Sequence, residues 1–221
     1  MIIESINKKE ALRYLGIKGE PDSKTAELID VCEKELLKVI EPKFLFRKFE
    51  IAEVPDGVDV GNGSLFLSGE GIKKHLVGCK SAVLMCATLG QGVDRLIRQL
   101  QITDLAKAVI IDALASSATE RLCDYVEKEI RSSAENYHLT TRFSPGYDDL
   151  PIAIQKEFLS LLSAQKKIGL CSTDSMLLTP RKSVTAIIGL SDKKTRKYKS
   201  CDNCNLKDTC RYRKDNNHCG K

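Results

Sequence analysis

The longest apolar pattern in this chain is a helical stripe that begins at Asp104 and runs to about Tyr137. Its apolar residues recur every three or four positions, which places them on one face of a single long helix. At 221 residues the chain is long enough to bury a proper core around such a helix. The residues expected to be buried are Leu105, Val109, Ile110, Ala113, Ala118, Leu122, Val126 and Ile130.

Shorter helices and strands surround this helix in mixed order. Ala82–Ala87 is a continuous apolar run that predicts a central strand, and Gly61-Asn62-Gly63 marks a hairpin turn. Because helices and strands do not alternate regularly, we expect an α+β fold: a twisted, largely antiparallel sheet with flanking helices, plus a cysteine-rich C-terminal tail. The other expected strands are Phe44–Ile51, Val58–Val60, Leu65–Leu67, Ile168–Cys171, Met176–Thr179 and Ser183–Leu190. The other expected helices are Lys8–Leu15, Ser23–Ile40, Gly69–Leu76, Val93–Leu100 and one that Asp148, Asp149 and Pro151 begin and that runs through Leu162.

The charge of the chain is unevenly distributed. The net charge is +5, and residues 192–221 hold 10 Lys and Arg against 4 Asp, so the body before them is close to neutral. A basic tail suits a negatively charged partner, such as nucleic acid, an acidic protein or a cluster with thiolate ligands. We therefore divide the chain into a domain of residues 1–191 and a basic metal-binding tail of residues 192–221.

The apolar runs are too short to cross a bilayer, and the first residues mix acidic and basic side chains without a cleavage site. These features predict a cytoplasmic protein with no membrane partner. Five cysteines stand singly among apolar neighbours, and we expect them to be buried thiols in a reducing compartment. They are Cys32, Cys79, Cys86, Cys123 and Cys171.

Four further cysteines gather in the tail, where four soft ligands within 19 residues predict a metal site. An iron–sulfur cluster needs four thiolates and tolerates irregular spacing. Zinc more often takes two close pairs of ligands. We favour iron–sulfur, and zinc stays open as the alternative. The spacing is Cys201-x2-Cys204-x5-Cys210-x8-Cys219.

An arginine, a glycine and a tyrosine share the short irregular turn Arg142–Tyr147. The guanidinium of Arg142 matches a carboxylate in two-point contact, and Gly146 lets the main chain approach a ligand closely. The ring of Tyr147 suits a cation. The turn therefore fits a small ligand with a carboxylate and a cation, although Pro-Gly-Tyr also fits a plain turn with a packed ring.

The same turn resembles the adenosylmethionine-binding motif in the activation domain of cobalamin-dependent methionine synthase, in its stand-alone form. The recognisable match spans roughly residues 80–190. The segments that carry the resemblance are Ala118–Leu122, Arg142-x-x-x-Gly146-Tyr147, Thr173-Asp174-Ser175 and Pro180-x-x-Ser183-Val184, with Ala11–Gly16 upstream in relatives where the domain stands alone.

The resemblance implies a ligand site with no catalytic residue. Arg142 would bind the carboxylate of S-adenosylmethionine, the backbone around Ser144 would contact its adenosine or amino group, and Tyr147 would lie beside the sulfonium. Gly146 completes the turn. Glu120 would face the same site, although a helix charge paired with a Lys or Arg one turn away explains it equally well.

The resemblance also implies a function in trans. The chain has no cobalamin-binding signature of its own, so a separate methionine synthase subunit would carry the cobalamin. This module would help to remethylate that cobalamin reductively. It would then be a component of that methyltransferase, with an electron donor such as flavodoxin or ferredoxin. Low-potential iron–sulfur clusters reach roughly −400 mV, the range that reduction of cobalamin requires.

Two alternatives stay open. One is a reactivating redox protein for another corrinoid methyltransferase. The other is a zinc-containing nucleic-acid-binding module, for which the basic tail would be the contact. The tail has only two aromatic residues, Tyr198 and Tyr212, which offers little for base stacking and disfavours nucleic acid.

Overall fold

The computed structural model describes residues 3–193 and has a six-stranded antiparallel sheet at its centre. The strand order is β3-β2-β1-β4-β8-β5, and each pair of neighbours runs antiparallel. The predicted α+β fold with a largely antiparallel sheet is thereby confirmed. The strands are β1 (Lys43–Val54), β2 (Gly57–Val60), β3 (Leu65–Ser68), β4 (Ser81–Thr88), β5 (His138–Leu139) and β8 (Ser183–Ser191), and a separate two-stranded ladder joins β6 (Cys171–Ser172) to β7 (Leu178–Thr179).

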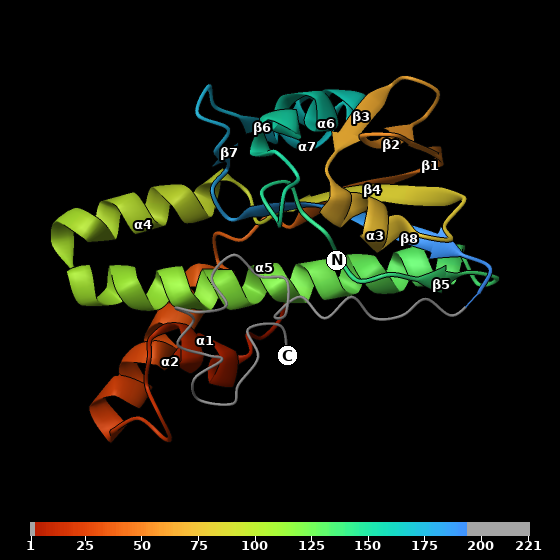
Figure 1. Cartoon of the computed structure of the whole chain (residues 1–221). Coiled ribbons are helices and arrows are strands. Elements are labelled where there is room, and N and C mark those ends of the chain that lie inside the picture. Colours follow the sequence, from red (N-terminus) through yellow and green to blue (C-terminus); the bar gives the residue numbers. More distant parts are fainter. Residues whose placement is uncertain (1–2, 194–221) are drawn as a thin grey trace.

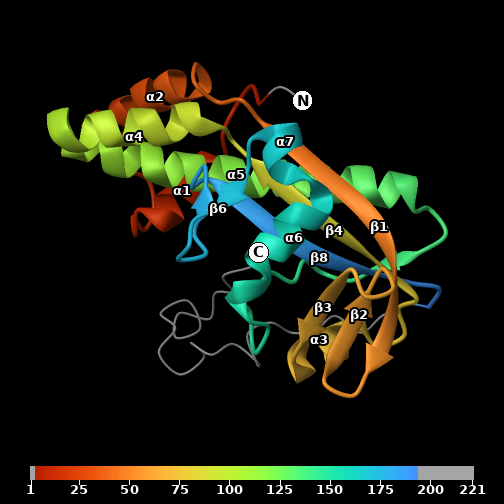
Figure 2. The same cartoon turned by 90° about the horizontal axis from the view of Figure 1, so that it is seen from above.

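Helices cover both faces of the sheet (Figures 1 and 2). One core cluster contains residues of α1 (Lys8–Tyr14), α2 (Ser23–Leu37), α4 (Gln91–Thr103) and α5 (Leu105–Ser133). The other contains residues of α3 (Glu70–Leu76), η1 (Ile152–Ile154), α6 (Gln155–Leu162) and α7 (Ala164–Ile168). Figure 1 shows α5 beneath the sheet and α6 and α7 above it, so the sheet is the middle layer.

The central strand β4 is apolar over Ala82–Ala87 because both of its faces are covered. Val83 and Met85 belong to the core on the α5 side, whereas Leu84 and Cys86 belong to the core on the α6 side. Side chains alternate along a strand, and here helices cover both faces, so each of its residues is buried. Antiparallel pairing with β1 and β8 on its two edges then fixes β4 in the middle of the sheet.

The helix α5 supports most of the α5-side core. It begins after Asp104, whose carboxylate accepts a hydrogen bond from the Lys107 amide at 3.1 Å and caps the helix. Beyond its contacts with β4 and β8, it packs against α1, α2 and α4. Six of the eight residues expected in its buried stripe are indeed buried: Ile110, Ala113, Ala118, Leu122, Val126 and Ile130.

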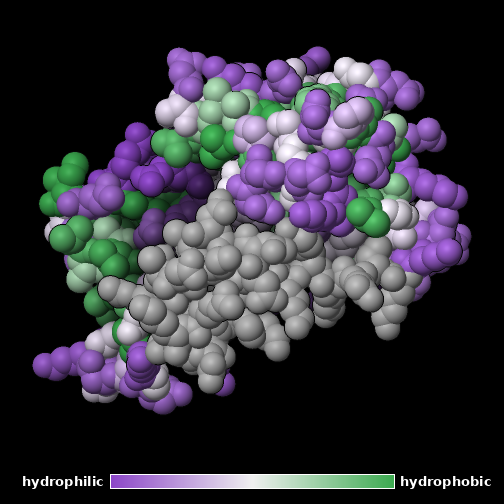
Figure 3. Space-filling model, viewed as in Figure 1, coloured by the Kyte–Doolittle hydropathy of each residue, from purple (hydrophilic) through white to green (hydrophobic). Residues whose placement is uncertain are grey.

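The prediction was wrong for the first two residues of the stripe. Leu105 is 66% exposed and Val109 is 53% exposed. The first turns of α5 extend past the end of the sheet, beside α4, so no strand covers them (Figure 1). Ile102 of α4 is 89% exposed as well, and Figure 3 shows apolar surface at this end of the molecule.

The hairpin signal is confirmed, and one predicted strand is wrong. β2 and β3 pair across residues 61–64, where Gly61, Asn62 and Gly63 have positive φ angles of +64°, +53° and +83°. Ile168–Cys171 does not form a strand, because Ile168 ends α7 and Gly169, at φ +69°, closes that helix in the left-handed conformation.

The five cysteines of residues 3–193 are free thiols. Cys32, Cys86 and Cys123 are buried as expected, and burial raises the pKa of Cys86 to about 12. Cys79 and Cys171 are only half-buried, so the expectation of burial was wrong for these two.

Between residues 3 and 193, no helix is long and apolar enough to cross a membrane. β8 ends at Ser191, and the tail cysteines Cys201, Cys204, Cys210 and Cys219 lie outside the described residues. The division into residues 1–191 and 192–221 therefore stays a prediction, as does the metal site of the tail.

Candidate ligand-binding site

The segment after β5 carries the predicted motif along the outer edge of the sheet. The Thr140 amide donates to the Gly189 carbonyl, and Phe143 exchanges two backbone hydrogen bonds with Ile187 of β8. Neighbouring side chains of an extended segment point to opposite sides. Phe143 accordingly joins the core on the α6 side, whereas Arg142 reaches α5.

Arg142 is held by two carboxylates of α5. Its Nη2 lies 3.2 Å from Glu120 Oε2 and 3.0 Å from Asp124 Oδ1. Residues four apart on a helix are neighbours on one face, so both acids can reach the same guanidinium. The Arg142 side chain is 24% exposed, against 43% for Glu120 and 63% for Asp124, so the acidic side of this cluster is open to solvent.

The second terminal nitrogen of the guanidinium makes no hydrogen bond within residues 3–193. Arg142 Nη1 is buried and has no hydrogen-bond partner among the described residues. Buried polar groups almost always have a partner, so this unpaired guanidinium nitrogen is an exception that marks Arg142 as a candidate ligand-binding residue.

The electrostatic surroundings keep Arg142 charged. Burial lowers its pKa, but Cys123, Glu120 and Asp124 oppose this and leave the pKa above its ordinary value. For Glu120, burial raises the pKa of the carboxyl, and the Arg142 cation works in the opposite direction. The cluster therefore offers a permanent cation beside carboxylates.

The motif glycine lies where the backbone needs it. The Tyr147 amide donates to the Ser144 carbonyl at 3.0 Å, with Pro145 and Gly146 at the two central positions and Gly146 at φ +89°. This is the pattern of a type II turn, which favours glycine at its third position. The half-buried Ser144 thus contributes its backbone to the turn.

Tyr147 lies with the α6-side aromatics rather than with the α5 carboxylates. It is 56% exposed, and its ring meets Phe143 edge-on with the centroids 6.0 Å apart. Phe143 in turn lies 4.8 Å from the ring of His75. The structure brings Arg142 and Glu120 together, and it places Tyr147 against the opposite side of the edge segment.

Asp149 attaches this turn to α3. Its carboxylate accepts hydrogen bonds from the amides of Glu70 at 2.7 Å and Gly71 at 2.9 Å, which are the first amides of α3. A Cβ on Gly69 would lie 2.5 Å from that carboxylate and one on Gly71 would lie 2.8 Å from it, so the two glycines permit the approach. Asp149 therefore caps α3, and the expectation that it begins the following helix was wrong.

Sequence reasoning missed Asp124 and the role of Lys182. Asp124 follows Glu120 by one helical turn, a spacing that could have indicated a shared partner. Lys182 Nζ lies 2.9 Å from the Asp112 carboxylate and 2.9 Å from Ser116 Oγ, so the Pro180-to-Ser183 motif ties the start of β8 to α5. Its lysine therefore has a structural role.

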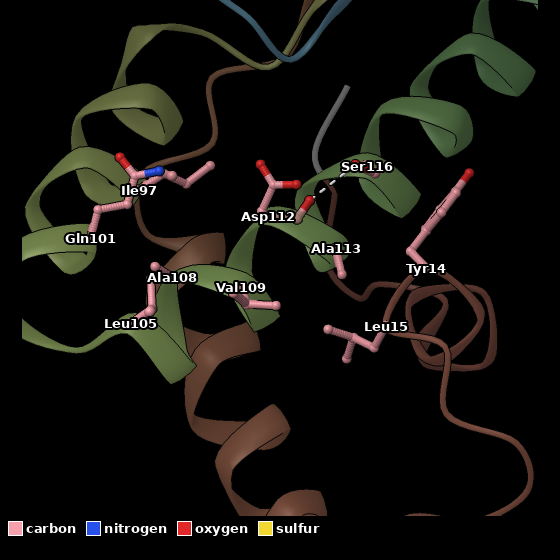
Figure 4. Close-up of a pocket in the computed structure, with 10 residues that line it drawn as sticks. All are labelled: Tyr14, Leu15, Ile97, Gln101, Leu105, Ala108, Val109, Asp112, Ala113 and Ser116. Carbon is pink, nitrogen blue, oxygen red and sulfur yellow. Dashed lines mark hydrogen bonds between the residues drawn. The ribbon is translucent and has the colours of Figure 1, made fainter.

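Two grooves lie elsewhere in the described part of the chain. One of about 370 Å³ separates α1, α4 and α5 (Figure 4), and one of about 610 Å³ lies between α6, α7 and β6. Neither is lined by Arg142, Gly146 or Tyr147. Within residues 3–193, His, Cys, Asp and Glu form no group that could hold a metal ion.

Comparison with known families places the chain in a class. A family model described as the activation domain of vitamin B12 dependent methionine synthase matches residues 72–217. The match covers well over half of the sequence and extends beyond residues 80–190 on both sides. The chain belongs to this family of methionine synthase activation domains.

Solved structures agree on the fold. Among 13 matching chains is the crystal structure of the MetH reactivation domain bound to AdoHcy, which is similar with a TM-score of 0.65 and 15% identity. The similarity covers 96% of this chain and 82% of that one. At this identity the likeness concerns the fold alone. No curated protein matches the sequence.

The capping role of Asp149 can be tested by Asp149→Asn. The variant loses the charge at the α3 N-terminus and one of two acceptors, so we expect unfolding to become easier by about 1–3 kcal/mol. Urea unfolding followed by circular dichroism measures this. The matched control is Asp174→Asn, which removes an exposed carboxylate paired with Lys156 and should change little. Equal stability of the two variants would contradict the role of Asp149.

Burial of His75 predicts a pH dependence of stability. Burial lowers the pKa of His75 to about 4, below the ordinary value of 6.5. Between pH 6.5 and 4 the unfolded chain takes up a proton that the folded chain does not. Lowering the pH therefore lowers the free energy of unfolding, by up to about 1.4 kcal/mol per pH unit. Urea unfolding at pH 7 and pH 5 should show a smaller decrease in the free energy of unfolding for His75→Gln than for wild type. The exposed His138→Gln serves as control, and an unchanged slope in His75→Gln would refute the expectation.

Proposed function

We propose that this chain binds S-adenosylmethionine and supports reductive remethylation of a cobalamin that a separate methionine synthase subunit carries. Membership of the activation-domain family supports the proposal. So does the likeness of its fold to a reactivation domain bound to AdoHcy, which is what S-adenosylmethionine becomes after it gives up its methyl group.

The observation that carries the proposal is the state of Arg142. Glu120 and Asp124 fix one end of the guanidinium, and the buried Nη1 at its other end has no partner among the described residues. A fixed guanidinium loses little conformational freedom when it binds, and a planar carboxylate is the acceptor that fits it. The α-carboxylate of S-adenosylmethionine would supply that acceptor.

The remaining charges suit the rest of the ligand. Its ammonium and sulfonium are cations, and the exposed sides of Glu120 and Asp124 would attract them. To reach the ring of Tyr147 as well, the ligand would cross the turn at Gly146, which presents no side chain. The exposed aromatic face of Tyr147 would then stabilise the sulfonium.

The role of these residues would be positioning. In the proposed methyl transfer, the electron pair of the broken carbon–sulfur bond would stay on sulfur, and the partner's cobalamin, reduced by one electron, would accept the methyl group. A separate donor such as flavodoxin or ferredoxin would be the source of that electron, and the tail cluster would pass it on. The transfer needs no general acid or base, so the chain would contribute by orienting the sulfonium.

The four tail cysteines would hold the redox group. Cys201, Cys204, Cys210 and Cys219 offer the four thiolates that an iron–sulfur cluster needs, and such a cluster would supply an electron of low potential. Zinc would instead give the tail a structural role. A corrinoid protein of another methyltransferase could take the place of the methionine synthase subunit without any change in the site.

The role of Arg142 can be tested by calorimetric titration of S-adenosylmethionine. Arg142→Ala removes a charge-assisted contact worth about 1.5–3 kcal/mol, so we expect affinity to fall roughly 10- to 100-fold. The matched control is Arg131→Ala, which removes an exposed arginine paired with Glu127 on the same helix. Binding of equal strength to wild type and Arg142→Ala would remove the assigned role.

The nature of the tail can be tested by metal analysis of the full chain purified without oxygen. We expect bound iron with visible absorption, and loss of both in the double variant Cys201→Ser, Cys204→Ser. Cys79→Ser, a half-buried thiol of the domain, should keep the metal. Stoichiometric zinc without iron would refute the iron–sulfur proposal and leave the zinc alternative.

A further inference from the structure

Three large apolar side chains are exposed where α4 ends and α5 begins. Ile102 is 89% exposed, Leu105 66% and Val109 53%. Leu105 and Val109 lie one turn apart on α5 and share one face of that helix, and Ile102 lies in the last turn of α4 just before them. Exposed apolar residues that gather in one place mark an interaction surface, whereas single ones are ordinary. We name these three residues the α4–α5 patch.

The groove of about 370 Å³ between α1, α4 and α5 continues this patch. Leu105 and Val109 belong to both, because they also line the groove (Figure 4). Gln101, the neighbour of Ile102 in α4, lines the groove as well, which places Ile102 at its rim. A protruding apolar side chain and a largely apolar recess therefore lie next to each other on one surface of the molecule.

The polar end of the groove is already occupied by Lys182. Its Nζ lies 2.9 Å from Asp112 Oδ1, 2.9 Å from Ser116 Oγ and 3.0 Å from the Asp112 carbonyl oxygen, and its side chain is only 15% exposed. What remains for an occupant is the apolar part beside the patch and the outer side of Asp112, whose side chain is 56% exposed. This combination suits an apolar side chain that is accompanied by a cation.

The outer face of α4 carries such a pair of groups. Arg98 and Ile102 are four positions apart, so they project from the same side of the helix, and both are exposed. The inner face of α4 is committed to the core through Val93, Ile97 and Leu100. The outer face of α4 thus presents a cation and an apolar side chain, and the groove next to it presents an apolar lining and a carboxylate.

We propose that the α4–α5 patch is the interface of a two-fold symmetric dimer of this chain, in which Ile102 of each copy enters the groove of the other. A contact across a two-fold axis is made by the same surface on both sides, so that surface has to be self-complementary. Here Ile102 matches the apolar recess, and Arg98 approaches the partner's Asp112. The patch itself bears no charge that a second copy would repel. The inference is independent of the proposed function, since it involves no S-adenosylmethionine.

Sedimentation velocity on the full chain, over a dilution series in the micromolar range, tests the proposal. We expect wild type to form a dimer, and Ile102→Glu to raise the dissociation constant about 10-fold or more, because it places a charge in an apolar recess at the centre of the interface. Since Ile102 is 89% exposed, this variant should keep the circular dichroism of wild type. The matched control is Leu177→Glu, which alters a 61% exposed leucine between β6 and β7 and should leave the dimer unchanged.

The charge contact is tested by a second variant. Arg98→Glu places a carboxylate opposite the partner's Asp112, so it should weaken the dimer, and more strongly at low salt than at high salt. Lys166→Glu makes the same change at an exposed lysine of α7 and serves as control. A monomeric wild type would overturn the proposal. So would a dimer that persists unchanged in Ile102→Glu or in Arg98→Glu, because the two copies would then meet through another surface.

Discussion

The packing of α5 under β4 and β8 is the interaction on which the rest of this structure depends. Ile111, Leu114, Leu122 and Val126 are fully buried on its sheet side, and burial of such side chains contributes about 1.5–3 kcal/mol each. Because that side is committed to the core, the opposite side of the helix is free to carry charge. The carboxylates that hold Arg142 are therefore placed by the same helix that organises the core.

The edge of the sheet is the second element of the site, and much of its motif serves the backbone. Gly146 satisfies a turn that needs positive φ, Asp149 caps α3, and Lys182 ties the start of β8 to α5. Such contacts help to set the position of Arg142 and Tyr147. A motif that is read as a ligand site from sequence is thus partly a set of structural contacts.

Features of the fold that depend on local sequence patterns could be predicted, whereas features that depend on long-range contacts could not. The β2–β3 hairpin and the buried run of β4 follow from turn chemistry and apolar content, which neighbouring residues express. The exposure of Leu105 and Val109 depends on where the sheet ends, and the capping role of Asp149 depends on α3, 79 residues away from it in the chain. Periodicity shows which face of a helix is apolar, but it does not show how far the surface beneath that face extends.

The charge of the Arg142 cluster bears on which ligand it prefers. Two carboxylates and one guanidinium leave the trio Glu120, Asp124 and Arg142 with a net charge of −1, and the acids are the more exposed members. A simple carboxylate would be repelled by that excess. S-adenosylmethionine carries a sulfonium and an ammonium against one carboxylate, a net of +1, whereas the thioether left after methyl transfer is neutral. Under the proposed function, the negative charge of the cluster would favour the cationic methyl donor over the neutral product.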